Sequence, residues 1–87
     1  MVYVDNMRAR YGTMIMCHML ADTSAELLAM ADKIGVHRAW LQDAGTYREH
    51  FDIALSKRAL AIQYGAETLT MRGVAQLLKH KRETGKI

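Results

Sequence analysis

A continuous apolar run at residues 14–20, interrupted only by His18, leads directly into the start of a helix. Such a run fits either a strand buried on both faces or a segment of buried helix. We favour the strand because the run is short and because Thr23 and Glu26, just beyond it, have the spacing of a capping box. Apolar residues follow at helical spacing, and Gly35 provides a left-handed helix end. The sequence therefore predicts a strand followed by an amphipathic helix.

The next segment, residues 36–42 with Trp40 and Leu41, is expected to form a second strand and complete a β-α-β unit, which favours a parallel pair and a right-handed crossover. The polar stretches at residues 6–13 and 43–49 are expected to be loops. The other expected elements are a strand at residues 2–4, a helix from its N-cap Ser56 to Tyr64, a strand at residues 67–69 and a helix capped by Thr70. We therefore expect an α/β fold with about four short strands, mostly parallel, packed with three helices.

Length and composition limit the class of protein. The 87 residues allow one small domain, residues 1–87, and an apolar fraction of 51% excludes a disordered linker. A single cysteine excludes both a disulfide scaffold and a four-thiolate zinc site, and it favours a reducing cytoplasm. No run of 18 apolar residues is present, so we expect no membrane-spanning segment.

The net charge of +3 is concentrated at the C-terminal end of the chain. From Arg72 onward there are five basic residues and one acidic residue, whereas the rest of the chain is close to neutral. Residues 79–87 are expected to form a basic, frayed end whose cations complement the dipole of the last helix. The alternative is a nucleic-acid contact through Lys79, Lys81 and Arg82. No aromatic residue interrupts that cluster, which argues against stacking on bases.

Histidines and carboxylates are expected to gather at the ends of strands. Asp5 ends the first strand, His18 and Asp22 lie at the end of the second, and His50 and Asp52 precede a helix. Ligands of open α/β sheets bind at the carboxyl ends of the strands, and these residue types suit a divalent metal ion completed by water. The metal candidates are Asp5, His18, Asp22 and His50, and the catalytic candidates are His18, His50 and Asp52. The alternative is a structural role, with His18 hydrogen-bonded in the core and Asp22 and Asp52 as helix caps.

A second group of residues fits an anion. Ser56, Lys57 and Arg58 occupy the expected first turn of a helix, where cations oppose the helix dipole but free N–H groups attract phosphate. Arg8, from the loop after the first strand, is the fourth phosphate-binding candidate. The alternative is a solvated helix face. The sequence contains neither a glycine-rich phosphate loop nor a dinucleotide fingerprint.

Several short blocks recur in the order of a known family and extend along the chain to about Val74. The blocks are residues 1–8, 18–23 with Glu26 and Leu27, 50–53 with 56–59, and Gly65 with Ala66. In these blocks the chain resembles the bacterial and phage family catalogued as domain of unknown function 4031. The resemblance implies a small cytoplasmic protein, in the host cytoplasm if phage-encoded, with no established activity. It also implies that Asp5, Arg8, His18, Asp22, His50, Asp52, Lys57 and Arg58 occupy the family's polar motif positions.

One departure from the family pattern concerns the first helix. Family members often have a histidine after Glu-Leu, where this chain has Leu28. If that histidine belongs to a site in the family, the resemblance implies that the site is altered in this chain.

These observations support two main hypotheses. The first is a phosphate- or nucleotide-recognising domain acting as a metal-assisted phosphoesterase on a phosphate-bearing small molecule, which requires His18 and His50 to lie close together. The second is a non-enzymatic binding or adaptor protein that acts as a homo-oligomer, most simply a homodimer, or on a host partner. It would use a methionine-rich apolar surface or the basic C-terminal helix. Direct nucleic-acid binding through the basic C-terminal residues is a third, weaker hypothesis.

Overall fold

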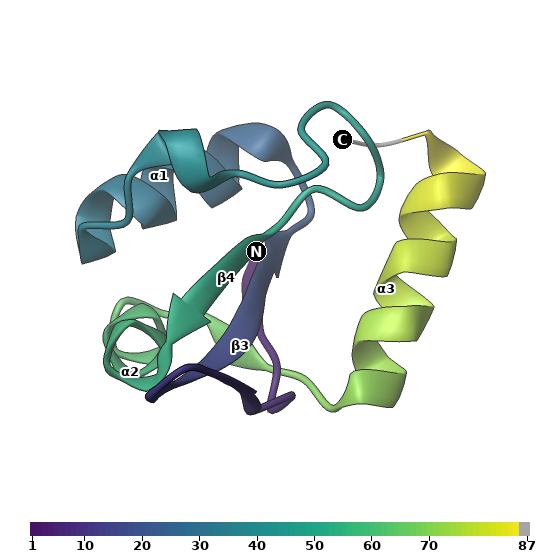
Figure 1. Cartoon of the computed structure of the whole chain (residues 1–87). Helices are drawn as coiled ribbons and strands as arrows, with labels where there is room; N and C mark the ends of the chain where they lie inside the picture. Colours follow the sequence, from purple (N-terminus) through teal and green to yellow (C-terminus); the bar gives the residue numbers. More distant parts are fainter. Residues whose placement is uncertain (86–87) are drawn as a thin grey trace.

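A mixed five-stranded sheet lies between two helices on one face and a third helix on the other (Figure 1). The computed structural model describes residues 1–85. In chain order the elements are β1 (Val2–Val4), β2 (Ala9–Tyr11), β3 (Met14–Ala21), α1 (Ser24–Ile34), the 3-10 helix η1 (Arg38–Trp40), β4 (Phe51–Ala54), α2 (Leu55–Gln63), β5 (Glu67–Thr68) and α3 (Met71–Thr84). Helices α1 and α2 cover one face of the sheet, and α3 covers the other (Figure 1).

Strand β3 is central because it is long enough to be paired along both edges. Along one edge it pairs with β1, where Val4 lies opposite Met19, and with β2, where Ala9 lies opposite Met16. Along the other edge it pairs with β4, where Phe51 lies opposite Met19. These three pairings are antiparallel, and β5 extends the sheet as the parallel neighbour of β1.

The α/β class and the three helices are confirmed, but the expected strand at residues 36–42 is wrong. That segment contains η1 and a single β-bridge between Gln42 and His50. This bridge is antiparallel, so the chain reverses its direction between Gln42 and His50. Strand β4 then pairs antiparallel with β3. The sheet is therefore mixed rather than mostly parallel, and no β-α-β unit forms there.

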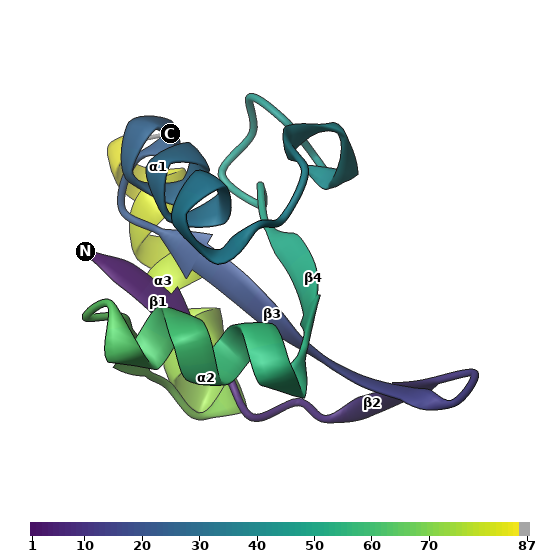
Figure 2. The ribbon, with the colours of Figure 1, turned by 90° about the vertical axis from the view of Figure 1, so that its left-hand side faces the viewer.

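The expected loop at residues 6–13 contains β2, which forms a hairpin with the start of β3. Gly12 and Thr13 make the two-residue turn, and Gly12 has a φ of 63°, a value that glycine adopts without strain. The hairpin extends beyond the body of the domain (Figure 2). Its apolar side chains Tyr11, Met14 and Ile15 are exposed.

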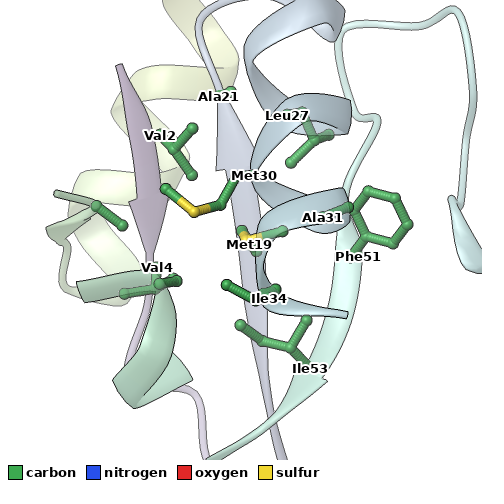
Figure 3. Packing of buried hydrophobic residues seen from close by; sticks show 12 residues of the cluster. Val2, Val4, Met19, Ala21, Leu27, Met30, Ala31, Ile34, Phe51 and Ile53 are labelled. Carbon is green, nitrogen blue, oxygen red and sulfur yellow. The ribbon is translucent and has the colours of Figure 1, made fainter. Parts of the chain in front are cut away.

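The hydrophobic core fills the space between the sheet and the pair α1 and α2 (Figure 3). Alternation along the strands sends Met19, Phe51 and Ile53 to this face, and burying each such side chain contributes roughly 1.5–3 kcal/mol. Cys17 points to the same side and is buried, whereas its neighbour His18 points to the face of α3. The cluster comprises Val2, Val4, Met19, Ala21, Leu27, Met30, Ala31, Ile34, Phe51, Ile53, Ala61 and Ala66.

Two of the three predicted helix starts are confirmed. Thr23 caps α1, accepting from the backbone N–H of Glu26 at 3.3 Å, and Thr70 caps α3 in the same way. The predicted cap Ser56 is wrong, because Ala54 occupies the N-cap of α2 and Ser56 lies inside its first turn. Within the described residues, no helix has the length and apolar character needed to cross a bilayer.

A buried lysine attaches α3 to the sheet. The Nζ of Lys81 donates a hydrogen bond to the carbonyl of Ala21 at 2.8 Å, and the residue is 1% exposed. Burial lowers the pKa of Lys81, an effect opposed by the carboxylates of Glu49 and Asp22. Residues 79–84 of the expected frayed end belong to α3, and residues 86–87 lie outside the described residues.

Candidate metal centre

Two histidines and one aspartate meet on the face of the sheet that α3 covers. His18 of β3 and Asp52 of β4 are direct partners in the antiparallel register, and His50 lies just before β4. The Oδ1 of Asp52 is 3.6 Å from the Nε2 of His18 and 3.6 Å from the Nε2 of His50. The two imidazole rings meet edge to face with centroids 5.1 Å apart. The structure thus brings together all three predicted catalytic residues.

Asp5 holds His18 in place through an interruption of the strand pairing. The backbone N–H of Asp5 donates to the carbonyl of His18 at 3.0 Å, as a regular ladder would require. In a regular antiparallel pair, the N–H of His18 would donate to the backbone carbonyl of Asp5. Here it donates to the side-chain Oδ1 of Asp5 at 2.8 Å. The other carboxylate oxygen, Oδ2, lies 2.7 Å from the Nδ1 of His18. One buried carboxylate therefore fixes both the backbone and the ring of His18.

The pair of Asp5 and His18 shifts both of their pKa values. Burial alone raises the pKa of the Asp5 carboxyl, but hydrogen bonds from the ring and backbone of His18 and from the backbone of Met7 outweigh burial and leave it below its usual value. The hydrogen bond to Asp5 raises the pKa of His18, against the opposite effect of burial, and the charges of Asp5 and Asp52 raise it further. An ionised Asp5 accepts only, so a neutral His18 carries its proton on Nδ1.

His50 is oriented in the same sense by a backbone carbonyl. Its Nδ1 lies 2.7 Å from the carbonyl oxygen of Arg48, which only accepts, so the proton of a neutral His50 is also on Nδ1. The backbones of Gln42 and His50 exchange two hydrogen bonds of 2.9 and 3.1 Å, which fixes the position of His50 at the start of β4. The side chain of Gln42 donates to the Oδ2 of Asp52 at 2.6 Å.

Three acceptor atoms therefore face one another, and residues 1–85 place no donor between them. The Nε2 atoms of His18 and His50 are unprotonated in the neutral rings, and the buried Oδ1 of Asp52 has no hydrogen-bond partner among these described residues. A separation of 3.6 Å is too long for a hydrogen bond. Ligand atoms about 2.1 Å from a tetrahedral ion lie roughly 3.4 Å apart, close to the distances seen. One ligand atom from each residue lies within 4.8 Å of the other two.

A cavity of about 130 Å³ adjoins the cluster on the side of α3. His18 and His50 form part of its wall, to which Arg48 and Asp43 contribute one basic and one acidic residue. A ligand bound by the cluster would thus have open space beside it. The lining residues are His18, Leu20, Asp43, Arg48, His50 and Leu78.

The segment that carries Arg48 and His50, the 42–50 loop, is anchored by a buried glutamate. Glu49 is 2% exposed, and its carboxylate accepts from the hydroxyl of Ser24 and from the N–H of Gly45, the latter at 3.1 Å. The 42–50 loop is therefore attached to the first turn of α1. Arg48 and Glu49 are not marked as site residues by the sequence, where they are two adjacent charges at the end of the polar stretch 43–49.

Two of the predicted metal ligands have other positions. Asp5 lies behind His18, where its carboxylate supports a ligand rather than acting as one, an arrangement common around protein metal sites. Asp22 lies apart from the cluster: its carboxylate accepts from the hydroxyl of Tyr3 at 3.1 Å and lies 3.4 Å from the N-terminal ammonium group.

The predicted phosphate-binding residues do not join the cluster. Lys57 donates to the carbonyl of Ile34 at 2.8 Å, at the C-terminal end of α1, and the Nε of Arg58 donates to the carbonyl of Asp5 at 2.7 Å. Arg58 thus bonds the carbonyl that the interrupted ladder leaves free. Neither the cavity beside the cluster nor the neighbouring one is lined by Arg8, Ser56, Lys57 or Arg58.

Comparison with known proteins gives one family. The family model described as "Protein of unknown function (DUF4031)" matches residues 2–81, which include every residue of the cluster and its supports. No curated protein and no solved structure gives a significant match to the chain.

Proposed function

The chain belongs to the DUF4031 family of proteins of unknown function, and we propose that it is a divalent-metal enzyme that hydrolyses phosphate esters. The observation that carries the proposal is the buried Oδ1 of Asp52, which lies 3.6 Å from two imidazole nitrogens and has no hydrogen-bond partner within the described part of the chain. Leaving a buried acceptor unsatisfied costs about 1–3 kcal/mol, so a cation between these atoms gives the arrangement a physical reason.

The donor set favours zinc over harder ions. Two neutral imidazoles and one carboxylate suit zinc, whereas magnesium and calcium prefer oxygen ligands. Cys17 lies on the opposite face of the sheet and supplies no thiolate. Catalytic zinc sites keep three protein ligands and an open position, and the cavity beside His18 and His50 provides space for that position.

The proposed reaction is hydrolysis of a phosphate ester by water. A zinc ion held by these three residues would lower the pKa of a coordinated water to about 7 and so supply a nucleophile at neutral pH. The water oxygen bonds to phosphorus as the bond from phosphorus to the leaving oxygen breaks. One water proton passes to solvent, and the leaving oxygen takes a proton from solvent. Arg48, in the wall of the same cavity, faces the negative charge of the phosphoryl group.

The roles differ from those expected for acid–base catalysis. His18, His50 and Asp52 serve as ligands, and Asp5 is a positioning residue that sets the proton of His18. We place the activity in the reducing cytoplasm, where the free thiol of Cys17 is preserved.

The first prediction concerns zinc and a small phosphodiester. Protein stripped with a chelator is expected to bind one zinc ion per chain by calorimetry, and to hydrolyse bis(p-nitrophenyl) phosphate only when zinc is present. His50→Ala is expected to lose both properties because it removes one of three ligands. His37→Ala is the matched control, since His37 is exposed and caps η1. Unchanged zinc affinity in His50→Ala refutes the metal centre, and zinc binding without hydrolysis refutes the enzyme.

The β2–β3 hairpin favours a second candidate function, self-association into a homo-oligomer. Tyr11, Met14 and Ile15 expose apolar surface on a protruding hairpin (Figure 2). Strand β2 pairs on one edge with β3, and the described residues place no strand along its other edge, which offers backbone groups to a second copy.

The second prediction tests this self-association. Sedimentation velocity is expected to show a dimer whose fraction rises with protein concentration. Tyr11→Lys places a charge in the apolar hairpin and is expected to shift the protein to monomer, whereas Arg10→Lys leaves the charge of the neighbouring position unchanged and serves as the control. A wild-type protein that stays monomeric at all concentrations contradicts this candidate.

A further inference from the structure

We propose that a basic groove between the 42–50 loop and α3 binds single-stranded nucleic acid and so determines the substrate of the metal centre. The inference rests on the proposed function, since it identifies the phosphate ester as a phosphodiester within an oligonucleotide. The basic groove is a hollow of about 290 Å³ lined by Tyr47, Arg48, Ala75, Leu78, Lys79 and Arg82.

The basic groove continues the cavity beside the metal ligands. Arg48 and Leu78 line both hollows, so the two share a wall. A chain that occupies the groove can therefore extend past Arg48 to His18 and His50. Figure 1 shows the 42–50 loop extending over the edge of the sheet towards the C-terminal half of α3.

The charge of the groove is positive and unpaired. Arg48, Lys79 and Arg82 are exposed, and no carboxylate belongs to its lining. Within residues 1–85, none of the three cations forms an ion pair, whereas the exposed Arg38 is paired with Asp32. Three unpaired cations along one hollow attract a polyanion, because each contact with a phosphate releases counterions.

The lining also offers surface for bases and sugars. Ala75 and Leu78 provide an apolar floor, and Tyr47 adds an aromatic ring although it is remote in sequence from Lys79 and Arg82. The hydroxyl of Tyr47 accepts from the Nε of Arg48 at 3.1 Å, and the guanidinium lies 5.5 Å from the ring centroid. Tyr47 therefore holds Arg48 at the junction of the two hollows. Cationic grooves with aromatic side chains are typical of single-strand binding.

The number of cations argues for an oligonucleotide rather than a mononucleotide. One phosphoryl group at the metal ligands needs only Arg48, which lines the adjoining cavity. Lys79 and Arg82 lie farther along the groove and would contact phosphates of the strand that follow the reacting one on that side. Lys81 is buried and therefore takes no part, which corrects the expected nucleic-acid contact through Lys79, Lys81 and Arg82.

The third prediction is a binding experiment without metal. In EDTA, a fluorescein-labelled oligothymidylate of about eight nucleotides is expected to bind, as measured by fluorescence anisotropy, because single-strand sites span about 4–16 nucleotides. Lys79→Ala combined with Arg82→Ala is expected to weaken binding at least about tenfold, since two charge-assisted contacts are lost. The slope of log K against log salt is expected to become less negative by about 1.4, the value for two phosphates on a single strand.

The matched control is Arg10→Ala combined with Lys33→Ala. It lowers the net charge by the same two units, but both side chains are exposed outside the groove, on β2 and α1. Equal weakening by the two double variants shows attraction by overall charge and overturns the proposal. Equal affinity for thymidine 5′-monophosphate, or for a duplex of the same length, overturns the assignment of a single strand.

Failure of this inference is distinguishable from failure of the metal centre. Asp52→Asn, which removes a metal ligand, is expected to bind the oligothymidylate in EDTA within about twofold of the wild type, because Asp52 does not line the groove. Zinc binding and hydrolysis of bis(p-nitrophenyl) phosphate without oligothymidylate binding reject the groove alone. Oligothymidylate binding without zinc binding rejects the metal centre and with it the substrate assignment.

Discussion

Asp52→Asn is expected to abolish stabilisation by zinc while leaving the metal-free protein at least as stable as the wild type. Within residues 1–85 the Oδ1 of Asp52 is a buried acceptor without a partner, so this oxygen makes no hydrogen bond there in the absence of a cation. In the wild type, the Oδ2 of Asp52 accepts from Gln42 at 2.6 Å. In the variant, the amide oxygen of the asparagine can take the place of that Oδ2, and the amide NH₂ then takes the place of Oδ1. The new amide group then faces the Nε2 atoms of His18 and His50 at 3.6 Å, and a small shift of the side chain brings it within hydrogen-bond distance of one of them.

The size of the effect follows from mass action. A ligand at 100 times its Kd stabilises the folded state by about 2.7 kcal/mol. For a domain of this size that corresponds to a rise in Tm of roughly 10–20 °C. Differential scanning fluorimetry of wild type and Asp52→Asn, with and without zinc, measures both halves of the prediction. Asp32→Asn is the matched control, since Asp32 is an exposed carboxylate paired with Arg38.

Two results would contradict this prediction. A clear fall in Tm of the metal-free variant would show that the carboxylate has a structural partner, and the argument from the unsatisfied oxygen would fail. An unchanged zinc-induced rise in Tm would show that zinc binds elsewhere in the chain.

The parts of the fold that follow from the sequence depend on local patterns. The capping box of Thr23 and Glu26 and the left-handed Gly35 define α1 with few alternatives. Strand β3 was identified because its apolar run is short and ends at that cap. Such signals depend on neighbouring residues and need no knowledge of distant contacts.

Strand β4 shows why the rest of the sheet was not predicted. Its four residues alternate between buried Phe51 and Ile53 and partly exposed Asp52 and Ala54, a pattern too short to distinguish from a loop that leads into a helix. The segment at residues 36–42, with Val36, Trp40 and Leu41, gives the stronger local signal for a strand. The bridge between Gln42 and His50 decides the outcome, and that contact depends on the tertiary fold.

The site was predicted in composition but not in roles. His18, His50 and Asp52 were identified as a group, yet their meeting depends on the register that places His18 opposite Asp52. Lys57 and Arg58 are cations whose partners are backbone carbonyls of Ile34 and Asp5. No sequence pattern marks such partners, because every residue has a carbonyl. The cations that line the cavities, such as Arg48, come from a loop and from the far end of the chain.

Asp5→Asn is expected to weaken zinc binding by about 10–100-fold at alkaline pH, the usual cost of losing a group that orients a ligand. The carboxylate of Asp5 accepts from the N–H of Met7 and His18 with one oxygen, and its other oxygen faces the Nδ1 of His18. An asparagine that keeps the backbone contacts turns its amide NH₂ towards Nδ1. That donor favours the opposite tautomer, which places the proton on the Nε2 that should bind zinc.

The pH profile separates this positioning role from a purely structural one. In the wild type, Asp5 raises the pKa of His18, so zinc competes with the proton at a higher pH than it would at an ordinary histidine. As pH falls through that raised pKa, apparent affinity is expected to fall by about tenfold per unit, because binding then releases one proton. Without the carboxylate, burial lowers the pKa of His18, and the fall is expected to begin at a more acidic pH.

Asp22→Asn is the matched control. Asp22 directly follows β3, the strand that carries His18, but its carboxylate accepts from the hydroxyl of Tyr3 and does not contact His18. Calorimetric zinc titrations across pH, with the Tm of each metal-free variant as a check on folding, compare the three proteins. An Asp5→Asn protein that keeps the wild-type midpoint of the pH profile would show that Asp5 does not set the proton of His18. A purely structural role leaves the midpoint of the pH profile of zinc binding unchanged. An equal loss of zinc affinity and an equal shift of that midpoint in Asp5→Asn and Asp22→Asn would therefore make Asp22 part of the metal centre as well.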